Sequence, residues 1–377
     1  MRFNFALANP ELQNALENET KYNSFFSLCL DTARGVQKNM SKEEANAEIL
    51  KNIRLVMGLN TDPEHYKNNP AARLEVDRAL NSTAKREAMF EVIAETVNDA
   101  LISGWENDPW FNRMVERKSM ALGDTNIFYI KDNTKLMISE VAASNHDLIR
   151  QRLGVGREVS VKVRNYGAKV YCEAERYLMG VEDWAELTGA ITKAYNDMIA
   201  GMIHNAFVSA GASLPSATNW NISITMADTT NKARFEKLLR DVSIASGTQA
   251  VIYGTDLALS NLQNLIPAGI FAEDAKRDIY TFGRIGHYNQ YDVVELPQRF
   301  KDENVLAANP YLYADDKLFI LPGNMDRPVK MYDEGGTQIY QVMDRDTHID
   351  HTFDYEVVRK FGILILTNVR FGTTTIL

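Results

Sequence analysis

The densest group of side chains that could do chemistry lies near the C-terminal end of the sequence. Carboxylates and imidazoles alternate in this run, which reads Asp344-Arg345-Asp346-Thr347-His348-Ile349-Asp350-His351 and is followed by Asp354. Such side chains could bind a divalent ion from one face of a strand and serve a metal-dependent hydrolase. The run lacks the glycine at the sixth position and the glutamate at the twelfth that a calcium hand requires. A solvated polar turn between two strands is the favoured interpretation, with the hydrolase as an alternative.

No other catalytic motif is present in the sequence. It contains no Gly-Lys-Ser or Gly-Lys-Thr of a phosphate-binding loop, no Gly-x-Ser-x-Gly and no His-Glu-x-x-His. The glycine pairs Gly154/Gly156 and Gly283/Gly286 lack the spacing of a dinucleotide-binding turn. We therefore expect no catalytic residue, no cofactor and no metal ligand, and a protein that is not an enzyme.

Single residues that could take part in chemistry have simpler structural interpretations. His204 has no second ligand nearby in the sequence and is predicted to be a buried histidine with its hydrogen bonds made. Met198 and Met202 are predicted to fill the core, and Cys172 to act as a small hydrophobic residue.

Composition indicates an ordinary globular protein. The chain has 377 residues, of which 45% are hydrophobic and 24% charged, and its net charge is −9. An acidic balance disfavours a large nucleic-acid interface, which needs a surplus of Lys and Arg. Cys29 and Cys172 lie far apart, which favours a reducing compartment. The N-terminus is too polar for a secretion signal, and the apolar run Phe361 to Leu366 is too short to span a membrane. We expect a soluble protein made in a cytoplasm.

The first 118 residues have the pattern of helices joined by polar turns. The clearest helix is predicted over 84–102, where apolar residues recur at spacings of three and four. Weaker patterns cover 11–16, 25–36 and 41–57. Because helices with one apolar stripe must lie against something, this region is predicted as an arm draped over a neighbour or as a small bundle.

The period of the pattern changes after residue 119. A strand is predicted at 126–130 and a short helix at 139–153. Polar and apolar residues then alternate strictly from 158 to 164, and Asn165-Tyr166-Gly167 signals a turn before a second run at 168–175. These runs predict a long two-stranded hairpin, which is marginal in water by itself and must find a partner surface.

The strongest single element is a helix that begins near Asp183. From Leu187 to Phe207 apolar residues repeat every four positions. A four-residue step overshoots the helical turn by about 40°, so the stripe rotates and contacts different neighbours at its two ends. We predict a long helix that acts as a spine and is buried against a sheet.

The remaining residues mix helices and strands and then become strand-dominated. Helices are predicted at 231–245 and 255–265, and strands at 222–226, 248–253 and 291–296. Further strands are predicted at 317–321, 330–332, 338–343 and 363–370. Because helix-rich and strand-rich regions are partly segregated, the fold class is α+β rather than a doubly wound sheet.

Two segments carry a resemblance to a known family. They are Tyr171-Cys172-Glu173-Ala174-Glu175-Arg176-Tyr177 leading into Asp183-Trp184, and Phe353 to Ile363. With the order of the parts, they resemble the major capsid proteins of tailed bacteriophages that have the Hong Kong 97-type fold. The resemblance implies an N-terminal helical arm (1–118), an E-loop region (119–180), the spine helix of a peripheral domain (181–211), an axial domain (212–325) and return strands of the peripheral domain (326–377).

The resemblance also implies a function. The chain would be a structural subunit that self-assembles through pentamers and hexamers into an icosahedral phage head around double-stranded DNA. It would be located in the virion after assembly in the host cytoplasm. Its partners would be its own copies, a portal protein, scaffold and decoration proteins, and packaged DNA through weak non-specific contact, with no membrane. The E-loop would lie on a neighbouring copy through Val159, Val161, Val163 and Tyr166.

Relatives differ in ways that leave alternatives open. Some remove an N-terminal scaffold segment, and some join neighbours through a Lys–Asn isopeptide bond. Lys162 and Lys169 lie on the predicted hairpin, but no residue-level match assigns them that chemistry. An encapsulin-like nanocompartment shell, with the same fold but protein cargo, is the nearest alternative function, and the metal-dependent hydrolase of Asp344 to His351 is the more distant one.

Overall fold

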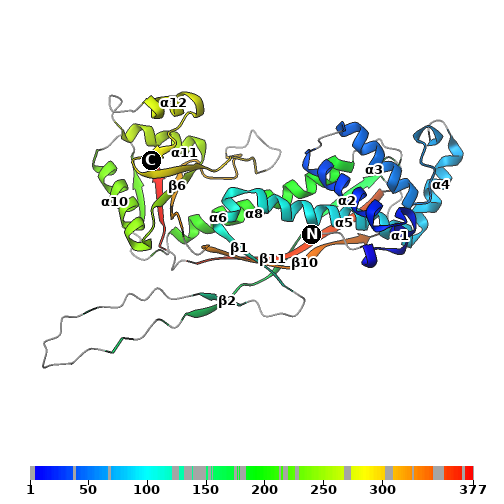
Figure 1. Ribbon diagram of the computed structural model, residues 1–377, viewed down its shortest axis with the longest axis horizontal. Coiled ribbons are helices and arrows are strands. Elements are labelled where there is room, and N and C mark those ends of the chain that lie inside the picture. Colours follow the sequence, from blue (N-terminus) through cyan, green and yellow to red (C-terminus); the bar gives the residue numbers. More distant parts are fainter. Residues whose placement is uncertain are drawn as a thin grey trace.

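A helix of 28 residues, α8 (Trp184–Gly211), joins two bodies of packed helices and strands in this computed structural model (Figure 1). The structure describes residues 5–36, 40–66, 69–120, 127–130, 138, 150–151, 154, 156–173, 176, 178, 184–211, 214, 220–225, 229–266, 273–301, 309–324, 327–342, 352–366 and 370–376.

The four-residue repeat of α8 is confirmed as its buried stripe. Ile191, Tyr195, Ile199, Ile203 and Phe207 are each at most 5% exposed. Its two ends have different neighbours, as the rotation of the stripe predicts. Near the start, Gly189 faces the backbone of α2, and at the end Gly211 lies against Thr373 of the second body.

The first body begins with a bundle of helices. They are α1 (Pro10–Leu16), α2 (Glu19–Arg34), α3 (Lys42–Val56), α4 (Pro70–Asn81), α5 (Thr83–Asn107) and α6 (Pro109–Met114), with 3-10 turns at Phe5–Leu7 and Pro63–Tyr66. Local signals explain their starts: Ser41 and Glu44 form a capping box, and proline follows the caps Asn9, Asn69 and Asp108. Phe26, Ile49 and Ile53 are fully buried in one core with α8. Of the two predicted arrangements for 1–118, the structure therefore has the bundle, packed on its own chain.

A four-stranded sheet completes the first body. Its strands are β1 (Val115–Met120), β10 (Val329–Val342), β11 (Thr352–Ile365) and β4 (Arg164–Glu173), in the order β1-β10-β11-β4. Helix α5 contacts β10, and α8 contacts β11. The predicted limit at residue 118 falls inside β1, so the helical region and the sheet share this strand.

The second body is built on a six-stranded sheet in the order β5-β12-β9-β6-β8-β7. Its strands are β5 (Asn221–Ile224), β6 (Ala250–Gly254), β7 (His287–Tyr288), β8 (Tyr291–Glu295), β9 (Lys317–Pro322) and β12 (Gly372–Ile376). The side chains of β6 alternate: Tyr253 belongs to the core shared with α8, and Ile252 packs on the opposite face. That face is covered by α10 (Thr229–Ser246), α11 (Asp256–Ser260) and the 3-10 turn Asn261–Leu265, while α12 (Glu273–Phe282) lies at the edge of the body (Figure 1).

The last strand differs from the sequence-based division of the chain. Residues 326–377 are predicted as strands of the body that holds the spine helix. Strand β12 instead pairs with β5 and β9, so it belongs to the second body. Phe371 lies against Phe207 of α8, which brings the chain from one body to the other at this point.

The predicted hairpin is wrong in its pairing. β3 (Arg157–Ser160) pairs with β2 (Ile127–Ile130), and β4 pairs with β11. Asn165, Tyr166 and Gly167 lie inside β4 rather than in a turn. Alternation of polar and apolar residues predicts an extended chain, but the partner strand comes from about 200 residues further along, which no local pattern records. The predicted helix at 139–153 lies largely outside the described residues.

Helices and strands are partly segregated, as predicted for an α+β fold: helices dominate up to Met114 and strands dominate after Lys317, while the two alternate between Asn221 and Glu295. The chain passes in turn through helices, an extended ribbon region, a spine helix, a second body and returning strands. This is the order of parts that the sequence analysis expects, and the α+β fold class is confirmed.

Candidate assembly surface

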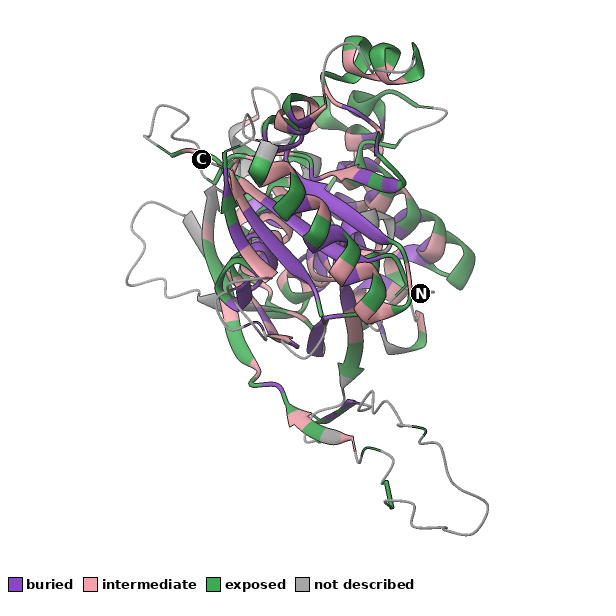
Figure 2. Ribbon diagram, turned by 90° about the vertical axis from the view of Figure 1, so that its left-hand side faces the viewer, coloured by how far each residue is buried: buried purple, intermediate pink, exposed green. Residues whose placement is uncertain are grey.

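The ribbon formed by β2 and β3 lies outside both bodies, below the four-stranded sheet in Figure 1, and the view in Figure 2 shows it apart from the buried strands. A small cluster attaches it to the sheet. Phe128 and Val161 are buried against Tyr332 of β10, and their rings and methyl groups form a core separate from those of the two bodies. The Tyr332 hydroxyl donates a hydrogen bond to the Ile127 carbonyl over 2.7 Å.

Two glycines allow the chain to leave the sheet at this point. A Cβ at Gly362 of β11 would overlap the Lys162 carbonyl. The segment after β3 can therefore cross β11 at this position only because residue 362 is a glycine. A Cβ at Gly156 would overlap the Ile130 carbonyl in the same way at the ribbon. Both glycines therefore help to set where the ribbon lies.

The outer face of the ribbon carries apolar side chains that the chain itself does not cover. Ile127 is 40% exposed and Tyr129 59% exposed, whereas Phe128 and Ile130 between them are buried. Ile138, in the segment between the two strands, is 99% exposed. Sequence reasoning did not single out these three residues, because the run Ile127-Phe128-Tyr129-Ile130 is apolar throughout and does not show which of its sides faces solvent.

The residues predicted to contact a neighbouring copy find partners in their own chain. Val161 is 2% exposed, and Val163 packs against the same cluster. Tyr166 stacks on Phe361 with ring centres 4.4 Å apart, and its carbonyl accepts a hydrogen bond from Tyr195 of α8. Val159 is half-buried. The premise that Val161 and Val163 lack an intrachain partner is therefore wrong, because the sheet brings Phe128 and Tyr332 to them.

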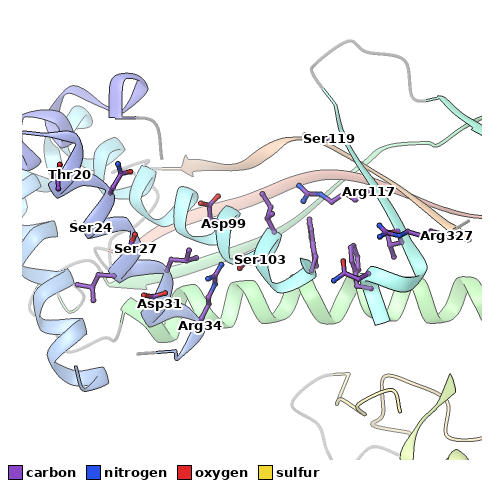
Figure 3. A pocket seen from close by; sticks show the side chains of 18 residues that line it. Thr20, Ser24, Ser27, Asp31, Arg34, Asp99, Ser103, Arg117, Ser119 and Arg327 are labelled. Carbon is purple, nitrogen blue, oxygen red and sulfur yellow. The ribbon is translucent and has the colours of Figure 1, made fainter. Parts of the chain in front are cut away.

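A groove of about 1300 Å³ runs along α5 in the first body, between α2 and β1 (Figure 3). Hydroxyl groups of Thr20, Ser24 and Ser27 line it from α2, at spacings of four and three. Arginines and carboxylates lie at intervals along it: Arg34, Arg117, Arg327, Asp31 and Asp99. Burial raises the pKa of the Asp99 carboxyl. The groove therefore presents hydrogen-bond donors and acceptors, together with positive and negative charges, along its length.

Three side chains of the groove have polar atoms without a hydrogen-bond partner among the described residues. They are Asn23 through Oδ1, Trp105 through Nε1 and Arg117 through Nε. A buried polar atom that lacks a partner costs about 1–3 kcal/mol.

A buried ion cluster adjoins the groove at Arg117 of β1. The Arg359 guanidinium donates to both oxygens of Asp333, over 3.1 and 2.7 Å, and Arg117 donates to Asp333 over 2.9 Å. The guanidinium groups of Arg117 and Arg359 lie 4.9 and 5.0 Å from the Trp105 ring. Asp333 and Arg359 are each 1% exposed, and together with the partly exposed Arg117 and with Trp105 they join β1, β10, β11 and α5.

His204 of α8 is buried between aromatic rings, as predicted, but only one of its two ring nitrogens has a hydrogen-bond partner within the described part of the chain. Its Nε2 accepts a hydrogen bond from the Ala314 N–H over 3.3 Å, and the rings of Tyr313 and Phe319 lie 5.2 and 5.5 Å away. Burial lowers the pKa of His204 to about 4. Met198 and Met202 pack against the core. Burial also raises the pKa of the Cys29 thiol well above its usual range, while the side chain of Cys172 lies outside the described residues.

The candidate metal cluster of Asp344 to His351 lies outside the described residues. Asp354 belongs to β11, but its side chain is also outside the description. In the part of the chain that the structure covers, no three His, Cys, Asp or Glu side chains gather as metal ligands would. Across the same residues, none of the helices is both long and apolar enough to cross a membrane.

Comparisons with solved structures find phage particles at low identity. The mature capsid of bacteriophage PhiM1 is 11% identical with a TM-score of 0.47, covering 71% of this chain and 87% of that one. The capsid of cyanophage P-SCSP1u is 13% identical with a TM-score of 0.45, covering 71% and 88%. The structure of Microbacterium phage Oxtober96 is 9% identical with a TM-score of 0.44, covering 70% and 89%.

The family assignment comes from the sequence rather than from these structures. No curated protein matches the chain. Residues 24–375 match the model of a family described as "SPbeta prophage-derived putative capsid protein YonB". Because that match spans nearly the whole length, the chain belongs to this family of prophage-derived capsid proteins.

Proposed function

We propose that the chain is the major structural subunit of a tailed-phage head and closes into an icosahedral shell around double-stranded DNA. Pentamers and hexamers of the chain would be the building units, and the protein would have no enzymatic activity. It would be located in the virion after assembly in the host cytoplasm. Family membership supports the shell role, and one structural observation carries the mode of assembly.

That observation is the ribbon with an uncovered apolar face. Ile127 and Tyr129 are exposed on a two-stranded ribbon that is attached to the body by a cluster of three buried residues. A ribbon of two strands is not independently stable, and exposed apolar area of this kind marks an interaction site. The E-loop region of one copy would therefore gain its stability by lying on the next copy.

The groove along α5 is a suitable receiving surface for that contact. It combines apolar side chains such as Leu28, Ile102 and Phe111 with the hydroxyl groups of α2. An extended segment needs both, because its backbone carries a donor and an acceptor at each residue. The hydroxyl groups of Thr20, Ser24 and Ser27 would supply hydrogen-bond partners to the backbone of the segment.

Other partners follow from the same proposal. A portal protein would occupy one vertex, and scaffold and decoration proteins would act during or after assembly. Contact with packaged DNA would be weak and non-specific, since a chain with a net charge of −9 repels phosphate over most of its surface. This property would let DNA enter and leave the shell.

Expression of the full chain followed by negative-stain microscopy and sedimentation tests the proposal. We expect closed particles from the wild type and none from Ile127→Ser/Tyr129→Ser. The variant should keep its far-UV circular dichroism and melting temperature, because both side chains are exposed. The matched control is Glu158→Gln, which alters an exposed residue paired directly with Tyr129 and should assemble as the wild type does.

Three results would count against the proposal. A wild type that stays monomeric under all assembly conditions contradicts the shell role. Normal particles from the Ile127/Tyr129 variant contradict the role of the ribbon. Particles that enclose a dedicated protein cargo instead of DNA would favour the encapsulin-like alternative.

A further inference from the structure

A cavity of about 390 Å³ lies beside α8, where α6 and the end of α5 meet the second body (Figure 1). Trp105 and Trp110 line it from the first body, Ile199 and Ile203 line it from α8, and Leu296 lines it from the segment after β8. These five side chains are each at most 6% exposed and belong to the main hydrophobic core. Core packing therefore fixes the walls of the cavity, as it does in the preformed pockets that bind small molecules.

Small residues keep this cavity open. Gly104 and Ala200 also line it, and neither has a side chain that reaches across the space. A Cβ at Gly104 would lie only 3.3 Å from the Asn196 amide nitrogen, so a larger residue there would push the end of α5 away from α8. Since an apolar cavity of about 150 Å³ holds one benzene ring, this cavity has room for a molecule of two rings.

The hydroxyl group of Tyr313 is a hydrogen-bond donor of the cavity. Tyr313 is 5% exposed, and its hydroxyl forms no hydrogen bond with a residue that the structure describes. The oxygen is not sealed from solvent, in contrast to the indole nitrogens of the two tryptophans, so a bound molecule can reach it. Burial raises the pKa of Tyr313 to about 12, and the hydroxyl therefore keeps its proton at neutral pH. It is available to an acceptor atom in the cavity.

Arg299 brings further donors to the same side of the cavity. Its Nη1 donates to Asp197 over 2.9 Å, whereas its Nη2 lies 4.0 Å from the Asp108 carboxylate, which is too far for a hydrogen bond. Within the described part of the chain, Nη2 and Nε therefore have no hydrogen-bond acceptor. Asp108 and Asp197 already balance the positive charge, so a second anion would be repelled. The site is suited to a neutral acceptor such as a carbonyl oxygen.

We propose that this cavity binds a neutral, largely apolar molecule of two rings through a carbonyl oxygen. The hydroxyl of Tyr313 and the guanidinium of Arg299 donate to that oxygen, and the rings pack against Trp110, Ile199 and Leu296. Because the walls come from both bodies and from α8, a bound molecule stabilises the arrangement of the two bodies. The site lies within a single copy of the chain, so the inference does not depend on the proposed function.

Binding of prodan tests the cavity. Prodan is a neutral naphthalene that carries a carbonyl group, and its fluorescence shifts to shorter wavelength in apolar surroundings. We expect saturable binding to the full chain and a melting temperature that rises with prodan concentration. Ala200→Leu fills the cavity and should abolish binding, whereas Ala194→Leu, at an exposed position of the same helix, should bind as the wild type does. Absence of saturable binding, or equal binding by a folded Ala200→Leu variant, overturns the proposal.

Tyr313→Phe tests the polar contact, because it removes the hydroxyl and leaves the ring in place. We expect the affinity for prodan to fall about fivefold, as the loss of one hydrogen bond implies. The affinity for naphthalene, which has no carbonyl group and is measured by displacement of prodan, should stay the same. An unchanged affinity for prodan, or an equal loss for both molecules, would show that the hydroxyl does not bind the carbonyl oxygen and would overturn this part of the proposal.

Benzophenone gives a measurement that needs no variant, and it decides the question if Ala200→Leu does not fold. It is neutral, has two rings and a carbonyl group, and on irradiation it attaches covalently to C–H groups that it contacts. We expect mass spectrometry to find the label within residues 104–111, 196–203 or 294–299. A label confined to other segments overturns the proposal. If the chain binds these probes and forms no particles, only the proposed function is wrong.

Discussion

The spine helix α8 and the ribbon β2–β3 are stabilised in opposite ways. The buried stripe of α8 belongs to a core that includes residues from both bodies, such as Phe26 and Phe319. Among the described residues, the ribbon is attached by a small cluster of Phe128, Val161 and Tyr332, with Val163 and Leu364 beside them, and by the hydrogen bond from Tyr332 to Ile127. One element is covered by its own chain, and the other leaves apolar side chains in solvent.

This difference predicts that changes in the spine affect folding, whereas changes on the outer face of the ribbon affect assembly. A change in the spine removes contacts that the monomer needs, so its effect should be measurable as a loss of stability. A change on the outer face of the ribbon removes less from the monomer, since Ile127 and Tyr129 are 40% and 59% exposed, so its main effect should be measurable when copies meet. The following changes test that separation, in order of their expected effect on the free energy of unfolding.

Asp333→Asn should have the largest effect. Its carboxylate is the partner of two arginines, and Arg359 is fully buried, so the change leaves a buried charge unpaired. Breaking a buried pair in this way costs about 3–5 kcal/mol. Denaturant unfolding measures this loss in the free energy of unfolding. Glu334→Gln, which alters a pair with Lys360 at 3.8 Å on a more exposed part of the same strand, is the control and should cost under about 1 kcal/mol. If both changes lowered the free energy of unfolding by the same amount, burial of the ion cluster would not contribute to stability.

Ile199→Ala should follow, with a loss of about 2–5 kcal/mol. Ile199 is 1% exposed at the centre of the spine, whereas Met198 beside it is only half-buried and is a weaker probe. The control is Val208→Ala on the same helix, since Val208 is 37% exposed and its truncation leaves no cavity. If both changes cost the same, the buried stripe of α8 has been wrongly identified.

Acid should weaken the spine through His204. Its pKa is about 4 in the folded protein and about 6.5 in an unfolded chain, so the unfolded state takes up the proton first as the pH falls. His204 therefore makes its full contribution to the free energy of unfolding above pH 6.5. This contribution decreases by about 3 kcal/mol in total as the pH falls towards 4. Denaturant unfolding of the wild type and of His204→Gln at pH 7 and pH 4.5 measures this contribution. The difference in the free energy of unfolding between the two proteins should be smaller at pH 4.5 than at pH 7. A difference that is independent of pH would refute it.

Val161→Asp should have a local effect. A carboxylate in the small cluster with Phe128 and Tyr332 is costly, but the cluster is separate from the cores of the bodies. We expect the ribbon amides to lose their protection from hydrogen exchange while the melting temperature of the bodies changes little. Loss of the whole fold would show that the ribbon is part of the main cooperative unit.

Local patterns predicted the elements of this fold well. The helix over 84–102 became α5, and the four-residue repeat from Leu187 to Phe207 became the buried stripe of α8. Strands at 126–130 and 248–253 were also predicted near their observed positions. These features depend on residues within one or two turns of each other, so the sequence contains all of the information.

Features that depend on distant residues were not predictable in the same way. The strand containing Tyr166 pairs with β11 rather than with its neighbour, and β12 joins the second sheet. Val161 is buried because Tyr332, 171 residues away, lies beneath it. The exposed face of Ile127 and Tyr129 followed from the same pairing, since only the position of the ribbon shows which side faces solvent.

Sequence alone determined that this chain has an acidic surface, a long rotating spine, segregated helices and strands, and no recognisable catalytic motif. Only the tertiary structure decided that the first helices form a bundle on their own spine, that Val161 and Tyr166 are covered from within, and that Ile127 and Tyr129 of the ribbon remain exposed. The physical reason is that hydrophobic pattern specifies which side of a segment avoids water, whereas packing over long distances in the chain specifies what covers it.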